Sequence, residues 1–184
     1  VPNYGANDGS LYFKFNTNDN FDSFSPQIDT FNKIIGRYNK VGNNIFADDF
    51  FWFVNHEYKS NSYVEVTKPA IKYYKEAGYL LINFSDVFLF MKAGDHKHRP
   101  NHADNSHIDI WKSNVNLFCD SGTYSYNDTK TPLPLENSIY HNVMLVNGLN
   151  QMAKSFNFMW IDWTTLKDIK INKDYIKIDY TVQP

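Results

Sequence analysis

The spacing of hydrophobic residues changes along this chain, and the first part has the spacing of helices. Apolar side chains recur three or four positions apart between Ile28 and Tyr38, and Asp29-Thr30 can cap such a helix. This helix is expected to stop near Gly42. A second helix is expected over Phe46–Val54, where apolar residues lie nearly all round the axis and indicate a well-buried element.

From about Tyr63 the hydrophobic residues follow the spacing of β-strands, in short runs bounded by turn residues. The runs lie at residues 63–66, 79–83, 87–92, 107–111, 114–118, 142–146, 166–171 and 175–181. The segment Asn172-Lys173-Asp174 predicts a hairpin between the last two runs. We therefore predict a mainly β fold, an antiparallel β-sandwich preceded by a short α-helical segment. Its last strands are expected to lack partners that a complete protein would supply.

The composition limits the classes of partner. The 184 residues carry a formal net charge of −2, so no overall basic field would attract nucleic acid. An acidic ligand would need a local group of cations. No apolar run is long enough to span a bilayer, so no membrane partner is expected. The single cysteine, Cys119, excludes an intrachain disulfide framework and is expected to be a buried apolar side chain.

Three possible metal ligands lie on separate segments. His102, Asp120 and His141 each stand at the end of an extended run, and the ends of paired strands converge in a β-rich fold. Two imidazoles and a carboxylate suit zinc, with a fourth position filled by water or another group. Such residues also occur as ordinary hydrogen-bonding groups in turns at strand ends, and that alternative stays open.

A concentrated group of titratable residues precedes His102. The run Asp95-His96-Lys97-His98-Arg99 is the one cationic loop of the sequence. Removing the proton beside the carboxylate of an acidic sugar requires that this carboxylate be neutralised, and His, Lys and Arg donors can do so. A base and an acid, roles suited to His and Tyr, then move the protons. The alternative is a solvated polar loop.

The motifs around these residues resemble the β-domain of the heparinase II/III family of polysaccharide lyases. The similar stretches are H-A-D at 102–104, C-D-S-G-T-Y-S-Y at 119–126, H-N-V-M-L-V-N-G-L-N-Q at 141–151 and P-N-Y-G-A-N-D-G at 2–9. The resemblance implies a structural zinc ion on His102, Asp120 and His141. It also implies that residues 1–60 are the end of an α/α-toroid domain with a linker, and that residues 61–184 form the β-sandwich.

The resemblance has further implications for the whole protein. It implies a piece of a longer bacterial protein, for which the periplasm or secretion is favoured and the cytoplasm stays open as an alternative. The upstream helical domain of that protein partners this chain and carries a catalytic Tyr and Asn. An acidic polysaccharide or oligosaccharide is the expected substrate, cleaved by β-elimination, with His96, Lys97 and Arg99 binding it. By itself, the chain is expected to be inactive.

The sequence departs from the family pattern at two places. Active family members commonly show H-x-H-x-D, and here Pro100 takes the place of the first, catalytic His. His98 is the nearest candidate to replace it, with His96 behind it. An Arg usually found shortly before the H-N pair is absent from residues 135–140. These departures favour the alternative function, a non-catalytic carbohydrate-binding or scaffold β-domain of a polysaccharide-processing protein.

The remaining candidates receive lesser roles. A metal hydrolase is a third hypothesis, but no separate general base stands beside the His/His/Asp set. Asp104, His107 and Asp109 are interpreted as groups that support the ligands or lie on a strand surface. His56 is interpreted as a structural residue.

Overall fold

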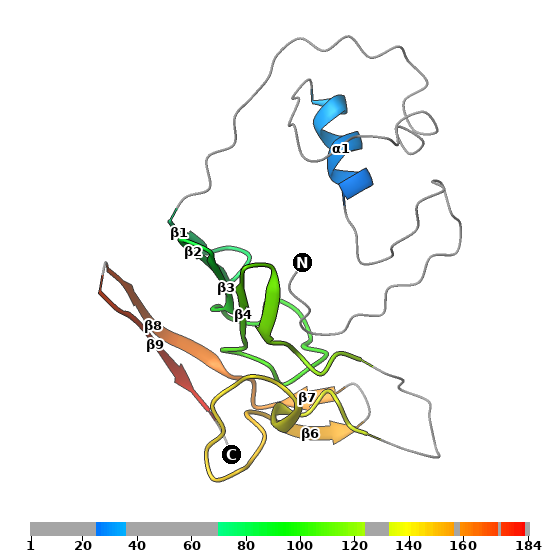
Figure 1. Cartoon of the computed structure of the whole chain (residues 1–184). Helices are drawn as coiled ribbons and strands as arrows, with labels where there is room; N and C mark the ends of the chain where they lie inside the picture. Colours follow the sequence, from blue (N-terminus) through cyan, green and yellow to red (C-terminus); the bar gives the residue numbers. More distant parts are fainter. Residues whose placement is uncertain (1–24, 36–69, 124–132, 157–158, 173, 183–184) are drawn as a thin grey trace. The chain divides into compact units, whose positions relative to one another are not determined.

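The computed structural model describes residues 25–35, 70–123, 133–156, 159–172 and 174–182. The chain separates into two compact units, one of which contains residues 9–68 and the other residues 69–184 together with residues 2–8. The single α-helix of the described residues belongs to the first unit and every strand to the second (Figure 1). The predicted helix at Phe46–Val54, the predicted strand at 63–66 and His56 lie outside the described residues.

Helix α1 spans Ser25–Ile34 and confirms the first predicted helix, but it begins earlier than expected. Asp29-Thr30 lies inside the helix, so the predicted cap was wrong. Pro26 occupies the first turn, where a missing backbone N–H leaves no helical hydrogen bond unmade. The predicted end near Gly42 lies outside the described residues. No helix of the described residues has the length and apolar character needed to cross a membrane.

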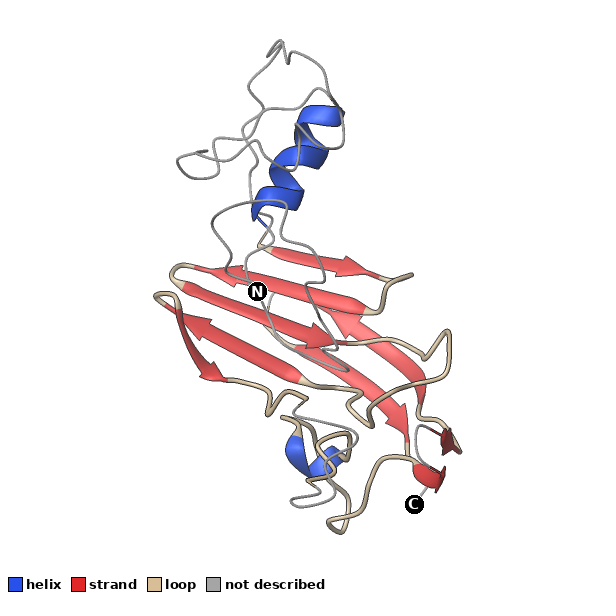
Figure 2. Ribbon diagram, turned by 90° about the vertical axis from the view of Figure 1, so that its right-hand side faces the viewer, coloured by secondary structure: helices blue, strands red, loops and turns tan. Residues whose placement is uncertain are grey.

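The second unit is built on a five-stranded sheet in which each strand pairs with the next along the chain (Figure 2). All four pairings are antiparallel. The strands are β1 (Ile71–Tyr74), β2 (Tyr79–Phe84), β3 (Val87–Lys92), β4 (Ile108–Lys112) and β5 (Val115–Phe118). The sequence pattern predicted all of these except β1, which has only four residues and follows shortly after Pro69. The mainly β, antiparallel fold is thus confirmed.

Two short hairpins follow this sheet. Strands β6 (Ala153–Phe156) and β7 (Met159–Ile161) form a two-stranded sheet that the sequence pattern did not predict. Strands β8 (Thr165–Ile171) and β9 (Ile176–Thr181) form the predicted hairpin. Its turn is held by Asn172, whose Oδ1 accepts hydrogen bonds from the backbone N–H groups of Asp174 and Tyr175, both at 2.9 Å.

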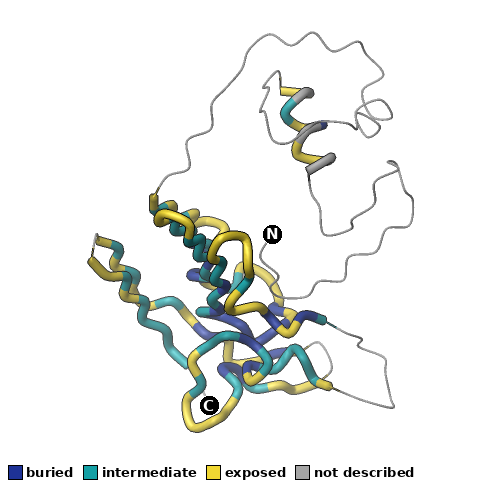
Figure 3. The backbone as a smooth tube through the Cα atoms, in the orientation of Figure 1, coloured by how far each residue is buried: buried dark blue, intermediate teal, exposed yellow. Residues whose placement is uncertain are grey.

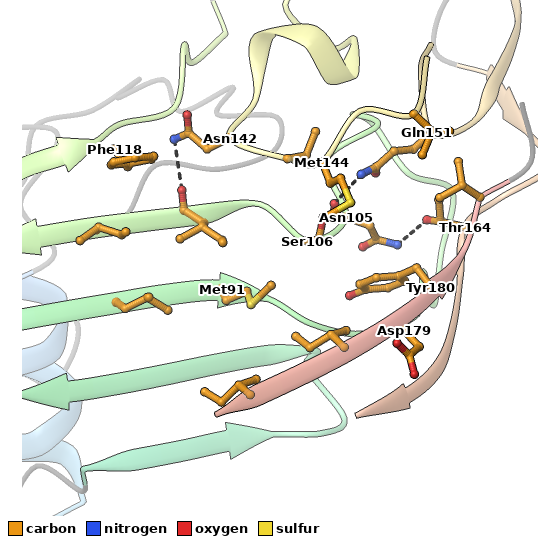
Figure 4. Close-up of a pocket in the computed structure, with 18 of the residues that line it drawn as sticks. Met91, Asn105, Ser106, Phe118, Asn142, Met144, Gln151, Thr164, Asp179 and Tyr180 are labelled. Carbon is orange, nitrogen blue, oxygen red and sulfur yellow. Dashed lines mark hydrogen bonds between the residues drawn. The ribbon is translucent and has the colours of Figure 1, made fainter. Parts of the chain in front are cut away.

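The β8–β9 hairpin faces the five-stranded sheet across an open groove of about 960 Å³ (Figure 4). One wall is apolar and comes from strands β2 to β5, while Ile176, Ile178 and Tyr180 of β9 form the other. Tyr180 bridges the layers where its hydroxyl donates to the backbone oxygen of Lys92 at 3.3 Å. A two-stranded second layer therefore covers only part of the sheet's apolar face.

The predicted strand at 142–146 was wrong. This segment is irregular because Asn142 uses its side chain to bridge two strand ends: its Nδ2 donates to the backbone oxygens of Ile108 at 3.1 Å and Cys119 at 3.0 Å. An isolated β-bridge joins Val146 to Leu149. The intervening Asn147 and Gly148 have φ angles of 54° and 72°, which confirms the N-G turn.

The buried stretches of the second unit are drawn in dark blue in Figure 3. The large side chains that are fully buried there are mostly polar. Besides Leu80 and Met152, the largest fully buried side chains are His102, Asp104, Asn105, His107, Asp109 and Ser138. Ser138 links two segments, since its hydroxyl donates to Ala103 O at 2.7 Å and accepts from the Gln151 N–H at 3.0 Å. Buried polar groups need such partners, so the region surrounding His102 is held by a hydrogen-bond network.

Candidate functional site

Four ionisable side chains from distant parts of the sequence meet in this buried region. His102 Nδ1 lies 3.2 Å from His141 Nε2, and the other nitrogen of His141, Nδ1, lies 2.6 Å from Asp120 Oδ2. His107 Nδ1 lies 3.4 Å from the same carboxylate oxygen. All four residues are buried. The structure thus brings the three residues singled out as metal ligands together and adds His107, which we interpreted only as a supporting group.

Three of these four side chains stand at the ends of elements, whereas His102 lies in the loop between β3 and β4. His107 immediately precedes β4, and its backbone oxygen accepts from the Lys92 N–H at 3.0 Å. Asp120 follows β5 at a turn in which its Oδ1 accepts from the Gly122 N–H at 2.7 Å. His141 follows the short 3₁₀ helix η1 (Ser138–Tyr140). The ends of elements therefore converge as expected, although His141 stands in irregular chain and not in a strand.

Burial controls the protonation of the imidazoles. Removal from water lowers the pKa of His102, and the neighbouring His141 lowers it further. Burial likewise lowers the pKa of His107, against the opposing effect of the Asp120 carboxylate. Both rings are therefore neutral at neutral pH, which is the state in which imidazole nitrogens bind metals.

His107, Asp120 and His141 form a triad that can hold a metal ion. One ligand atom from each lies within 4.8 Å of the others. His107 Nε2 is buried and has no hydrogen-bond partner within the described part of the chain, and such an atom favours a further ligand. The sequence pattern alone did not identify His107 as a member of this group. The alternating pattern of residues 107–111 showed only that His107 points to the other face of the strand from Ile108. Its position directly before β4, at a strand end like the other candidates, could have indicated its role.

The donor set of imidazole nitrogens and a carboxylate oxygen suits a divalent ion such as zinc. Ligand atoms on one tetrahedral zinc ion lie roughly 3.3–3.5 Å apart when bonds are about 2.0–2.2 Å. The 3.2 Å between His102 and His141 and the 3.4 Å between His107 and Asp120 are close to this spacing, but they belong to two different sets of ligands. His102 and Asp120 approach opposite nitrogens of the His141 ring, so one ion shared by these three residues requires one of the side chains to rotate.

Asp104 and Asp109 support the surroundings of this cluster. Asp104 is buried and forms an ion pair with Lys92. Burial by itself would raise the pKa of Asp104. The neighbouring Lys92 ammonium outweighs this effect and holds that pKa below its usual range. Asp109 is also buried and accepts a hydrogen bond from Asn116 Nδ2 at 3.2 Å. Both residues are thus interior groups and not part of a strand surface.

Cys119 is exposed, so its predicted burial was wrong. It follows β5, the edge strand of the sheet, whose residues Leu117 and Phe118 are also more than half exposed, at 55% and 53%. Alternation correctly separates the side chain of Cys119 from the buried Asp120. Within the described part of the chain, no layer covers the face of this edge on which Cys119 lies.

The cationic loop directly precedes the buried cluster. Lys97, His98 and Arg99 are exposed, whereas Pro100 is buried. Lys97 Nζ lies 3.8 Å from Glu76 Oε2 in an ion pair whose side chains are 58% and 88% exposed. Such an exposed pair contributes little free energy, so Lys97 remains available to an anionic ligand.

His96 is placed differently from the three exposed residues of the loop. Its Nε2 lies 3.3 Å from Thr164 Oγ1, and its ring packs edge-on against Trp163 with centroids 6.2 Å apart. Burial lowers its pKa to about 4, with a further lowering by Lys92. His96 is therefore neutral at neutral pH and contributes a hydrogen-bonding ring, not a charge.

Comparisons with known proteins point to one family. Residues 66–180 match the family described as Heparinase II/III-like, C-terminal. A search of curated proteins finds no match. Among solved structures, heparinase III with methylated lysines has 18% identity and a TM-score of 0.47, over 63% of this chain and 18% of that one. Another heparinase III structure has 16% identity and a TM-score of 0.43, over 73% and 20%.

This chain therefore spans about a fifth of the length of the solved structures that it matches. The family match, in contrast, covers more than half of the chain and includes the cationic loop, the buried cluster and nearly all of the strands. The chain belongs to the heparinase II/III-like family, through the C-terminal domain of that family.

Proposed function

We propose that this chain is the β-domain of a polysaccharide lyase that cleaves a uronate-containing glycan by β-elimination. The observation that carries this proposal is the position of the exposed cations Lys97 and Arg99. They lie on a loop that leads directly into the buried His102 cluster, inside the segment that matches the family. A rigid polar interior thus supports a solvent-facing loop whose charge suits an acidic sugar.

The chemistry assigns distinct roles to the loop residues. In β-elimination a base removes the proton on C5 of the uronate, its electrons form the C4=C5 double bond, and the C4–O bond breaks as the leaving oxygen takes a proton. Lys97 and Arg99 neutralise the carboxylate, which makes the C5 proton more acidic. His98 is exposed and stands nearest to the family's catalytic position, so it is the candidate proton carrier on this chain.

We further propose that His102, Asp120 and His141 hold one structural zinc ion, with His107 beside the Asp120 carboxylate, where its Nδ1 accepts a hydrogen bond from the Asn142 N–H at 3.3 Å. When bound, the ion contributes folding free energy by joining three segments of the chain. The neutral state of His102, its 3.2 Å separation from His141 and the family pattern support this ligand set. No proton transfer is assigned to the metal.

A second candidate function is a non-catalytic carbohydrate-binding or scaffold domain of a polysaccharide-processing protein. Pro100 supports it, because this buried residue has neither a donor nor a titratable group at the place of the family's catalytic His. Binding of acidic oligosaccharide is common to both functions. Turnover by the protein together with its upstream helical domain distinguishes them.

Replacing Lys97, His98 and Arg99 together by alanine tests the proposed role of the loop. We expect binding of acidic oligosaccharides to weaken about tenfold or more, while zinc content and melting temperature stay close to those of the wild type. Lys112→Ala removes an exposed cation at the far end of β4 and should leave binding unchanged. If the loop variant keeps full affinity, or loses zinc as well, the loop is not a substrate-binding element.

A further inference from the structure

Trp163 lies beside the cationic loop, although nothing in the spacing of the sequence singles it out. The loop is fastened at both ends to the segment that contains this residue. At its start, Asp95 Oδ1 accepts a hydrogen bond from the Leu166 N–H at 2.6 Å. At its end, the backbone oxygen of Asn101 accepts from Trp160 Nε1 at 3.0 Å. The exposed cations therefore project from a stretch of chain held at both ends against residues 160–166.

The indole ring of Trp163 is held in place by its polar edge. Its Nε1 donates to the backbone oxygen of Trp160 at 2.7 Å, and the His96 ring packs against it edge-on. Asp162, directly before it, has a φ angle of 54° and turns the chain between β7 and Thr164. Trp163 remains 39% exposed, whereas Trp160 and Thr164 are buried at 2% and 3%. It is a positioned and partly open aromatic surface.

From this arrangement we propose that Trp163 is a stacking platform for one sugar ring of the bound glycan. This inference rests on the proposed function and deepens it. An indole offers a rigid apolar face that suits the C–H face of a pyranose, and it loses little conformational freedom because its two side-chain angles are already set. Lys97 and Arg99 then hold the carboxylate of a neighbouring unit. Charge selects an acidic glycan, and the ring provides affinity that does not depend on charge.

The neutral state of His96 suits this role. His96 directly precedes the exposed cations in the sequence of the loop. Its ring bonds to Thr164 and packs against the indole. A neutral imidazole at this place fixes the ring without repelling Lys97 or Arg99. The contact thus couples the position of the platform to the position of the loop.

Two oligosaccharides of equal length separate the contribution of stacking from that of charge. The probes are a hexamer of 4-linked uronate and the neutral 4-linked glucose hexamer, with dissociation constants measured by calorimetry on the full chain. Trp163→Ala should weaken both probes by a similar factor, on the order of tenfold. Trp163→Phe retains an aromatic face and should recover most of the loss. The Lys97→Ala/Arg99→Ala pair should weaken only the uronate hexamer.

Phe84→Ala is the matched control, because Phe84 is a 76% exposed aromatic residue in the β2–β3 hairpin, and binding should not change. Unchanged affinity of Trp163→Ala, beside a loss in the Lys97/Arg99 variant, would overturn the platform and leave the proposed function standing. Failure of the wild type to bind uronate while Trp163→Ala still weakens the neutral hexamer would overturn the proposed function alone. If Trp163→Ala does not fold, Trp163→Phe and Trp163→Leu decide, since only the phenyl ring should preserve binding.

Discussion

His102 Nδ1 and His141 Nε2 lie 3.2 Å apart, although 39 positions separate the two residues in the sequence. Neither side chain is in a strand, and each is fixed by its neighbours in the backbone. Ala103, next to His102, donates its N–H to Glu136 O at 2.9 Å, and the His141 N–H donates to Ser138 O at 3.1 Å. The pair therefore depends on the network of residues 136–138, and a change there should disturb the candidate metal site from a distance.

The first prediction separates His102 from His107 as a zinc ligand. His102→Asn and His141→Asn should each abolish binding of zinc and lower the melting temperature by several degrees, because binding free energy at a structural site is folding free energy. His107→Asn should retain stoichiometric zinc. Elemental analysis of protein purified without added metal, together with thermal unfolding with and without chelator, provides both readouts. Loss of zinc in His107→Asn, with zinc retained in His102→Asn, would assign the site to His107, Asp120 and His141.

The sequence predicts the longer strands and the candidate ligands better than it predicts the hydrogen bonds between distant segments. The strands β2, β3 and β4 and the β8–β9 hairpin were found because alternation and turn residues coincide there. Strands β6 and β7 have four and three residues, too few for a periodic pattern. The segment 142–146 has the alternation of a strand, but Asn142 bonds across two strand ends instead. Such tertiary hydrogen bonds are not encoded in local spacing.

The second prediction concerns acid stability. The folded pKa of His96 is about 4, mainly because of burial, and lies below the ordinary value of 6.5. Between these values the unfolded chain binds a proton that the folded chain does not, so stability falls as the pH drops from about 6.5 towards 4. His96 accounts for on the order of 1–2 kcal/mol of this loss, since the site is only partly buried.

His96→Gln keeps a polar side chain and should flatten part of this pH dependence, as measured by urea unfolding at several values between pH 4 and 7. Nuclear magnetic resonance of the His96 ring reports the titration directly. A ring that titrates near 6.5 in the folded protein would contradict its contacts with Trp163 and Thr164.

The third prediction tests the close approach of Gly78 and Gly94. A Cβ atom on Gly94 would lie 2.4 Å from the Cα of Gly78, and this neighbour is backbone that no rotamer change can move. Gly94→Ala should therefore destabilise the domain by about 1–3 kcal/mol. Gly148 provides the control: no atom lies within 4 Å of an added Cβ, and asparagine tolerates its φ of +72°. Gly148→Asn should stay within about 1 kcal/mol of the wild type, and equal losses in the two variants would exclude the steric cause.

The last prediction concerns turnover. This chain by itself should show no measurable lyase activity, even on a glycan that it binds. β-Elimination needs a base, an acid for the leaving oxygen and a clamp for the carboxylate held in one geometry, and such positioning contributes on the order of 7–11 kcal/mol to lowering the barrier. The described residues provide the exposed cations Lys97 and Arg99 and one exposed imidazole, His98, while Pro100 stands at the family's catalytic position. On the family resemblance, the missing Tyr and Asn belong to the upstream helical domain, so adding that domain should restore turnover if the protein is a lyase.

The assay for turnover is the rise in ultraviolet absorbance of the unsaturated uronate product over a panel of uronate glycans. Robust turnover by the chain alone, abolished in His98→Ala, would show that the loop suffices and that the helical domain is not required for the chemistry.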